Sequence, residues 1–455
     1  MKLKLVAVVA SMSALGLISG PAIAGAKQND TNTTPAAHHD YKDYKGTAEK
    51  VCSITPNAMT MVEMSQNVGR SIPNPCNPGW FNRIRVSGGI NLDLGKWGNR
   101  NANIMGENYQ TLSLNDAYLN LTGQVNDWTT VFASLSYMTA TTNANPAPYK
   151  GVGLAEYDAA YANNIGGTAN NTLQIEQAFA TVANFDETPV YLQVGKFYQD
   201  FSRYEIHPIT ASMTQVMSET LSTSLKLGFL VDNFNGSVFV FNDPINKIGA
   251  SSTPTNYGVS VGYDLNNPDF GWDIGAAYLY NIIGANDVAW SVTNFTGGGY
   301  NSRVSAVALY GDVNYGPFMV AARYTQATQR FNVNDMTKNG NADLAAGSFA
   351  IGSGFAVTPA ATATGAKPWA AGIQAGYGFD AWSMSQNVYL GYQTSREAAG
   401  LNLPKNRWLV GYGVDALKDT NVAAEWDHDT QFSTSNGGLG NATNLVSVRA
   451  SVKFG

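Results

Sequence analysis

Residues that carry chemistry are scarce in this chain of 455 residues. It has two Cys and four His, and 13% of its residues are charged. The sequence contains no Cys or His set with metal-ligand spacing, no Gly-rich loop suited to a phosphate, and no basic surface for nucleic acid. No Ser or Cys stands in the sequence context of a catalytic nucleophile. We therefore expect a protein that is not an enzyme, with no cofactor, no metal and no nucleic-acid partner.

The four His have structural explanations beside their chemical ones. His38 and His39 could bind a metal weakly, but a solvated pair explains them better, and His207 precedes Pro208 in a loop. His428 lies between two Asp residues, and a carboxylate–His pair could serve acid–base catalysis. The missing nucleophile argues against that interpretation.

Long apolar runs are also missing beyond the first residues. A transmembrane helix needs about eighteen or more consecutive apolar residues, and none follows the leader. The leader has Lys2 and Lys4, an apolar run over 5–18, and the small-residue motif at 22–24. This pattern predicts a secretory signal peptide over 1–24, cleaved after Ala24, with a retained membrane anchor as the alternative. No Cys follows the site directly, so we do not expect lipidation.

What the sequence does contain is a long series of strands. No linker divides residues 83–455, so we expect one all-β domain. Its apolar and polar residues alternate with period two, as they do in half-buried strands. The predicted strands are 83–95, 114–125, 129–138, 173–183, 190–198, 224–232, 237–243, 256–266, 271–281, 302–314, 317–328, 370–380, 384–395, 407–417, 420–431 and 444–455.

The connections between these strands alternate in length. Those after every second strand are tight, whereas the others run from roughly ten to forty residues, an alternation typical of bacterial outer-membrane barrels. The predicted tight turns are Asn126-Asp127, 185–187, Asn235-Gly236, 267–269, Tyr315-Gly316, Asp380-Ala381 and Lys418-Asp419. We therefore predict a 16-stranded antiparallel transmembrane β-barrel in the bacterial outer membrane, with a short N-terminal periplasmic segment.

The alternation also predicts which face meets lipid. Sixteen strands enclose a space too wide for side chains to fill, so the apolar face should meet outer-membrane lipid and the polar face should line water. Aromatic residues near the turns suit the two interfacial girdles. Two strands are ambiguous: Lys196 falls in line with apolar residues, which indicates a bulge or a position beyond the bilayer edge, and 302–314 fits either phase.

Charged residues on the polar face are the candidate pore lining. Opposed charges across a pore screen solutes by charge and size, and an excess of lumen cations would favour anions. The alternative is that the charges form salt bridges within the wall. The candidates are Arg83, Arg85, Asp93, Asp116, Glu176, Lys226, Arg323, Glu425, Asp427 and Arg449.

Two long loops are further candidates. Loop 199–223 carries Arg203, Tyr204, Glu205 and His207, a set that suits a chelator or a sugar-like solute. Loop 329–369 is rich in Ala and Gly and weakly charged. A loop of that length could fold into the lumen as a constriction or cover the mouth of the barrel.

Residues 25–82 do not resemble barrel strands. They could form a small plug, a periplasmic extension or a tether, and they contain Cys52 and Cys76. In an oxidising periplasm we expect this pair to form a disulfide, closing a loop of about 25 residues and contributing roughly 3 kcal/mol. Two free thiols are the alternative.

Three segments resemble the LbtU-type siderophore porin family. They are 194–198 (VGKFY) with 207–210 (HPIT), 269–282 (DFGWDIGAAYLYNI) and 315–320 (YGPFMV). The resemblance implies a sixteen-stranded outer-membrane barrel that takes part in siderophore-dependent iron uptake in intracellular gamma-proteobacteria without TonB coupling. This chain departs from the family in residues 25–82, because many members have a coiled-coil heptad stretch there and this chain has none.

Two classes of function remain open from the sequence. The first is an outer-membrane channel, either for a small-molecule iron chelate or for general diffusion. The second is a surface adhesin or structural barrel whose loops bind other partners. Sixteen strands favour transport, because eight strands suffice for display.

Overall fold

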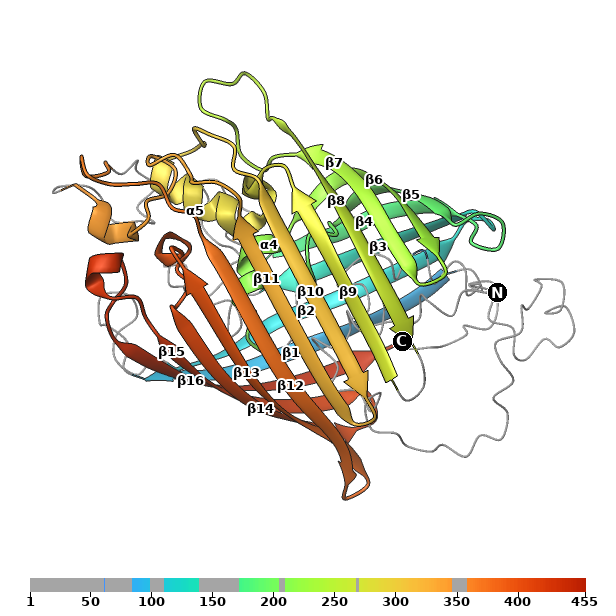
Figure 1. The fold of residues 1–455 in the computed structure, drawn as a ribbon. Helices are drawn as coiled ribbons and strands as arrows, with labels where there is room; N and C mark the ends of the chain where they lie inside the picture. The colour runs from blue at the N-terminus through green and yellow to red at the C-terminus, as the bar shows by residue number, and fades with distance from the viewer. Residues whose placement is uncertain are drawn as a thin grey trace, which may run out of the picture.

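The computed structural model describes residue 61 and residues 84–98, 110–138, 172–203, 209–266, 270–345 and 358–455. These residues form the predicted closed barrel, in which every strand pairs antiparallel with its neighbours and the last strand pairs with the first (Figure 1). The strands are β1 (Ile84–Gly98), β2 (Gln110–Gln124), β3 (Thr129–Met138), β4 (Thr172–Ala183), β5 (Val190–Tyr198), β6 (Leu221–Val231), β7 (Phe234–Asn242), β8 (Thr255–Asn266), β9 (Phe270–Leu279), β10 (Ala306–Tyr315), β11 (Phe318–Ala327), β12 (Trp369–Ala381), β13 (Met384–Arg396), β14 (Asn406–Leu417), β15 (Thr420–Thr430) and β16 (Ala442–Phe454).

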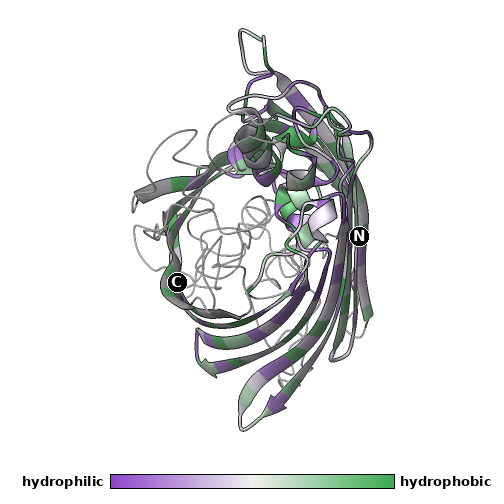
Figure 2. Ribbon diagram, turned by 90° about the vertical axis from the view of Figure 1, so that its left-hand side faces the viewer, coloured by the Kyte–Doolittle hydropathy of each residue, from purple (hydrophilic) through white to green (hydrophobic). Residues whose placement is uncertain are grey.

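The strands present an apolar face outwards, as the period-two pattern predicts. In β6, Leu225, Leu227 and Phe229 are exposed on the outer surface, whereas Ser224 and Lys226, which alternate with them, are buried on the lumen side. Successive side chains of a strand point to opposite faces, so the apolar set can contact lipid only if the polar set faces the lumen. Figure 2 shows the resulting alternation of hydrophobic and hydrophilic bands along the strands.

In the described part of the chain, no helix has the length and apolar character needed to cross a membrane.

Three of the predicted tight turns are displaced. Between β6 and β7 the turn is 232–233, and the predicted Asn235-Gly236 lies within β7. An Asn-Gly pair is the strongest local signal for a hairpin turn. Gly236 has another role here: it leaves room for the ring of Phe229 on the paired strand, which lies 2.7 Å from the position that a Cβ would occupy. Asp232 takes the positive φ of 51° that the turn requires.

The other two displaced turns also contain residues with positive φ angles. Asp380 and Ala381 belong to β12, and the turn is made by Trp382 and Ser383, whose φ angles of 54° and 61° are both positive. Tyr315 belongs to β10, and the turn begins at Gly316. The turns at 126–127, 185–187 and 418–419 fall where they are predicted. The remaining predicted turn, 267–269, lies outside the described residues.

A bulge in β4 explains the ambiguous position of Lys196. The register between β3 and β4 shifts so that Glu176 has no partner residue across the ladder. Lys196 stays on the outer face in line with Val194, and its ammonium group donates to the carbonyl of Ile175 at 2.9 Å. The bulge leaves backbone groups outside the ladder, and the cation satisfies one of them. Strand β10 also has a definite phase, with Ala306, Ala308 and Asp312 buried on the lumen side.

Aromatic residues lie at both ends of the strands on the outer surface. At the short-turn end, Tyr263 lies 5.4 Å from Trp272 between ring centroids, and Phe318 lies 5.0 Å from Tyr377. At the long-loop end, the corresponding pairs are Tyr257 with Tyr280 at 4.6 Å and Tyr392 with Trp408 at 4.7 Å. These two bands are the girdles expected at the membrane interfaces.

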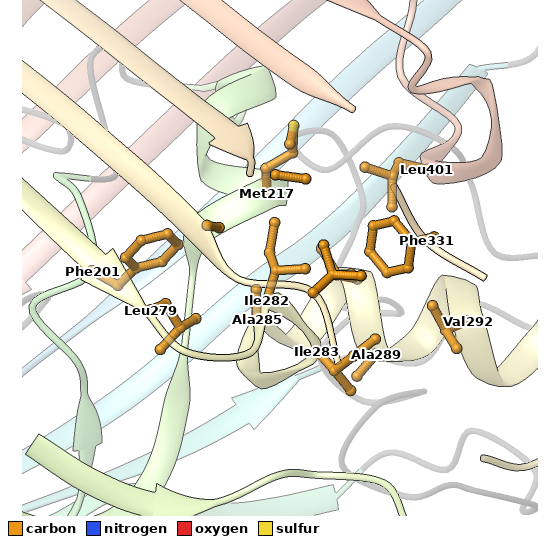
Figure 3. Packing of buried hydrophobic residues seen from close by; sticks show 14 of the residues in the cluster. Phe201, Met217, Leu279, Ile282, Ile283, Ala285, Ala289, Val292, Phe331 and Leu401 are labelled. Carbon is orange, nitrogen blue, oxygen red and sulfur yellow. The ribbon is translucent and has the colours of Figure 1, made fainter. Parts of the chain in front are cut away.

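The lumen face of β7–β12 is apolar at its long-loop end, which differs from the uniformly polar face predicted above. Small residues such as Ala277, Ala308 and Ala370 leave room there for helices from the loops. These are α4 (Met213–Ser218), η3 (Ile282–Gly284) and α5 (Asn286–Thr296), with η5 (Ala399–Leu401) and the loop around Phe331 (Figure 3). Two further turns of 3₁₀-helix are η4 (Gly340–Asp343) and η6 (Thr434–Asn436). The loops therefore fill one side of a barrel that its own strands cannot fill.

Candidate functional site: a loop across the barrel lumen

The loop between β5 and β6, residues 199–220, is fixed to opposite walls of the barrel, and we call it the lumen-crossing loop. Its first anchor is Asp200, whose carboxylate accepts hydrogen bonds from Lys226 Nζ at 3.1 Å and from Ser237 Oγ at 2.7 Å. The ammonium group also lies 4.9 Å from the ring centroid of Phe197. These contacts hold the start of the loop against β6 and β7.

The second anchor is Arg203. Its guanidinium donates to Asp273 Oδ2 at 3.2 Å and stacks over the ring of Tyr310 at 5.0 Å. Asp273 is the centre of an acidic row, since β8 places Asp264 and β10 places Asp312 directly opposite it. Like charges on adjacent strands repel. Arg203 therefore stabilises the wall as well as the loop.

The far anchor lies on β15, on the opposite side of the ring. The backbone N–H of Thr210 donates to Glu425 Oε1 at 2.9 Å, and its hydroxyl donates to Asp427 Oδ2 at 2.8 Å. Tyr389 on β13 donates to the other oxygen of Glu425 at 2.8 Å. Ile209 packs beside them in a buried cluster with Ala423 and Leu445 of the wall.

The loop then returns along β14 and β13. Arg407 Nη1 donates to the carbonyl of Ala211 at 3.3 Å, and the N–H of Met213 donates to Gln393 Oε1 at 2.8 Å. Helix α4 starts here, with Ser212 Oγ accepting the N–H of Gln215 at 3.0 Å as its N-cap. A hydroxyl at this position satisfies a backbone donor that the helix leaves free.

Contacts with α5 fix the end of the loop. The N–H of Asn286 donates to the carbonyl of Glu219 at 2.9 Å, and the side chain of Asn286 accepts from the N–H of Leu221 at 2.8 Å. Met217 packs into the apolar cluster with Ile282 and Leu401 (Figure 3). The described residues of the lumen-crossing loop, 199–203 and 209–220, are therefore attached to β6, β7 and β9 at its start, to β13–β15 further on, and to α5 at its end.

The wall beyond the loop carries its own charge pair. Arg449 on β16 donates from Nε and Nη2 to the two carboxylate oxygens of Asp93 on β1, each at 2.7 Å. Both side chains are buried, and the pair bridges the strands that close the ring. Two parallel N–H···O bonds give an arginine–carboxylate pair its geometric specificity.

The structure brings most of the described candidate charges into contacts within the wall. Lys226 pairs with Asp200, Arg323 with Asp312 at 2.9 Å, and Arg449 with Asp93. Glu176, at the β4 bulge, accepts from the hydroxyl of Tyr198 at 2.8 Å, whereas Glu425 and Asp427 hold Thr210. Pairing of Arg323 and Arg449 lowers the cationic surplus that the sequence suggests.

The remaining candidates are placed only in part or lie outside the described residues. Arg85 is buried on the lumen face of β1, and Asp116 lies in β2 opposite Asn91, where its side chain is not described. The candidates outside the described residues are Arg83, Tyr204, Glu205, His207, Cys52 and Cys76.

The structure separates His428 from the two Asp residues that flank it in sequence. Asp427 and Asp429 are buried on the lumen face, and Asp429 pairs with Arg407 at 2.7 Å. His428 lies on the other face, where its Nδ1 is 2.9 Å from Asn444 Oδ1 and its ring stacks with Trp426. The carboxylate–His pair considered above is therefore not formed. Among the residues that the structure describes, no group of three His, Cys, Asp or Glu is arranged to hold a metal ion.

The residues that attach the loop to the far wall were not predicted. Thr210, Tyr389, Gln393 and Arg407 are ordinary strand and loop residues in sequence, and the bonds that Thr210, Gln393 and Arg407 form between loop and wall span 215, 180 and 196 positions. One signal was available, namely the apolar residues Phe201, Ile209, Met213 and Met217 in a loop otherwise assumed to face water. Such residues indicate a loop that packs against something.

Comparison with known proteins supports the architecture. The sequence matches no established family profile. It is 28% identical over 264 residues to a UPF0422 protein of Coxiella burnetii (strain RSA 493 / Nine Mile phase I), covering 57% of this chain and 51% of that protein. It is 24% identical over 309 residues to a UPF0422 protein of Legionella pneumophila (strain Paris), covering 64% and 52%. The chain thus spans about half the length of the curated relatives it matches.

Solved structures share the fold at low sequence identity. The outer membrane channel DcaP of Acinetobacter baumannii aligns with a TM-score of 0.50 and 11% identity, over 82% of this chain and 97% of that one. OmpF of Salmonella typhi aligns with a TM-score of 0.52 and 14% identity, over 84% of this chain and all of that one. Together with the lipid-facing apolar surface, they identify the chain as a porin-like barrel of the bacterial outer membrane.

Proposed function

We propose that this chain is a diffusion channel for small hydrophilic solutes across the outer membrane. The observation that carries the proposal is the lumen-crossing loop, which narrows the barrel through anchors on opposite walls at Asp200 and Thr210. A barrel that only displayed loops on a surface would not need a loop fixed across its interior.

The solute that we favour is a ferric chelate, entering without TonB coupling. This part of the proposal rests on the resemblance to siderophore porins in the segments 194–198, 207–210, 269–282 and 315–320. Two of those segments contain structural elements of the constriction: 207–210 includes Thr210, and 269–282 includes Asp273. The resemblance therefore covers residues that position the lumen-crossing loop.

The charge pairing favours selection by size and hydrogen bonding over strong selection by charge. Arg323, Arg449 and Lys226 each have a carboxylate partner, so the field that they project into the passage is that of a dipole. The field of a dipole falls off faster than that of a single charge. We expect weak ion selectivity and solute-specific block.

Recordings from the purified chain in planar lipid bilayers test the channel. We expect discrete conductance steps and concentration-dependent block by ferric chelates of hydroxamate, catecholate or carboxylate type, with weaker block by the iron-free chelators. Arg203→Gln in the constriction should change the block. Arg330→Gln should not, because Arg330 pairs with Glu397 on the exposed outer loops. A barrel that conducts no ions would overturn the proposal.

Growth of a deletion strain separates a ferric-chelate channel from a general porin. We expect poor growth when iron is supplied as the cognate chelate, normal growth on abundant free iron, and the same difference in a TonB-deficient background. Slower entry of many unrelated solutes, with no particular effect on iron, would favour a general porin.

A second candidate function is a surface-binding barrel. It is favoured by the loops that pack together at the long-loop end, which we call the cap. There, α5, η5 and the loop around Phe331 share one apolar cluster with α4. A cap with its own core presents a fixed outer surface. Normal iron-limited growth together with an absence of conductance would support this candidate.

A further inference from the structure

The lumen face of β4–β6 has an apolar patch at its short-turn end, which is the periplasmic end in outer-membrane barrels. Further along the same face are polar residues such as Thr181, Gln193 and Lys226. Near the short turns this face carries apolar side chains, all of them buried in one cluster: Ala183, Phe185, Tyr191 and Leu230. Apolar residues on the wall of a water-filled passage are unfavourable unless another group covers them.

Met61 covers the patch. It belongs to the same buried cluster, and none of its side-chain surface is exposed. Its backbone carbonyl accepts a hydrogen bond from Thr181 Oγ1 at 3.1 Å, across 120 positions of sequence. The rings of Phe185 and Tyr191 meet edge to face at 6.3 Å beside it. Methionine suits such a place because its flexible thioether packs well against aromatic rings.

Met61 belongs to the part of the chain that precedes the barrel strands. Residue 61 precedes the first strand, which begins at Ile84 on the short-turn side of the barrel. The patch lies at that same side, next to the turns after β4 and β6. The chain at residue 61 is therefore inside the ring of strands, although it belongs to the part of the sequence before the barrel.

We propose that the patch formed by Ala183, Phe185, Tyr191 and Leu230 is a docking site for the chain's own N-terminal segment, with Met61 as the anchor. The two partners complement each other: the wall offers an apolar hollow with one hydroxyl donor, and the segment supplies an apolar side chain with one carbonyl acceptor. Docking tethers the segment within the periplasmic opening. The site does not depend on which solute the channel carries.

Disulfide trapping in native outer membranes tests the docking. In the full chain with Cys52 and Cys76 changed to Ser, we expect Met61→Cys with Leu230→Cys to crosslink under mild oxidation. Met61→Cys with Ser451→Cys should not, because Ser451 lies on the lumen face of β16, on another part of the wall. Equal crosslinking of the two pairs, or none in either, would overturn the proposal.

Proteolysis gives an independent measurement with a matched pair of variants. Met61→Asp places a charge in the apolar hollow, whereas Met61→Leu keeps an apolar side chain of similar size. We expect a protease added from the periplasmic side to remove the N-terminal segment roughly tenfold faster from Met61→Asp, and at the wild-type rate from Met61→Leu. Equal rates in all three proteins would show that Met61 does not anchor the segment. Ion conductance is not the readout, so failure here is distinguishable from failure of the channel proposal.

Discussion

The hydroxyl of Thr210 donates a hydrogen bond to Asp427 across 217 positions of sequence, at 2.8 Å. The bond joins the middle of the lumen-crossing loop to β15, while Asp200 and Arg203 fix the start of the loop to β6, β7 and β9. The loop that forms the constriction is therefore held at two opposite walls of the barrel. Its position depends on both attachments.

Thr210→Val removes the bond to Asp427 and keeps the size of the side chain. Removing one partner of a buried hydrogen bond leaves the other unsatisfied at a cost of about 1–3 kcal/mol, so the loop should shift between attached and detached positions more often. We expect larger current fluctuations and higher mean conductance in bilayer recordings. Thr293→Val is the control, because that hydroxyl bonds only within α5. Identical current traces from the two variants would argue against a loop that the Thr210–Asp427 bond holds in place.

Gly411→Ala should disturb the same attachment indirectly. A Cβ at Gly411 would lie 1.8 Å from the ring of Tyr389, the residue that donates to Glu425. The ring must move, and Glu425 then loses a donor. We expect a lower thermal unfolding temperature and conductance changes like those of Thr210→Val. Gly376→Ala is the control, because its nearest neighbour would be 3.4 Å away, an ordinary contact.

Exchange of the charges in the Asp93–Arg449 pair tests the closure of the ring. Breaking a buried pair on one side leaves an unpaired charge at a cost of about 3–5 kcal/mol. Asp93→Arg and Arg449→Asp should therefore each reduce the heat-modifiable folded band on electrophoresis. The double exchange should recover much of it, because the opposite charges again face each other across β1 and β16. No recovery would mean that the pair acts through its exact shape alone.

The lipid-facing surface can be tested at two depths on one strand. Leu227 and Val231 lie on the outer face of β6, and both are exposed, at 49% and 44%. Leu227→Arg places a cation well inside the membrane, where it costs about 2–4 kcal/mol, whereas Val231→Arg lies beside the turn, where the cost is about 0–1 kcal/mol. Unfolding in detergent or lipid should show a large loss of stability for Leu227→Arg only. Equal losses would place the membrane boundary elsewhere.

The strand pattern was predictable because it is local. Alternation of apolar and polar residues and the alternation of short and long connections both appear within a few tens of residues, so β3 and β5 begin and end where the sequence predicts. The turn at Trp382-Ser383 was not predictable, because non-glycine residues there adopt positive φ angles that their types do not favour.

The constriction was harder to predict because its determinants are far apart in sequence. The sequence pointed to 329–369 as a loop that could enter the lumen or cover the mouth, and the described part of it packs in the cap through Phe331 and Met336. The shorter loop 199–220 crosses instead. Its partners Glu425 and Asp427 were recognised as lumen residues, but nothing local indicates that they receive Thr210.

The pairing of Arg449 with Asp93 also bears on how the protein assembles. The two residues are 356 positions apart. The free-energy cost of closing a flexible loop nevertheless rises by only about 0.6 kcal/mol for each doubling of its length. Closure of the ring therefore costs little free energy at equilibrium. It is expected to be slow, because the two terminal strands must find each other after all the hairpins between them have formed. Until they meet, the open edges of β1 and β16 have unpaired backbone groups that hydrocarbon cannot satisfy. Entry into the membrane and sealing of the ring thus have to proceed together as one event.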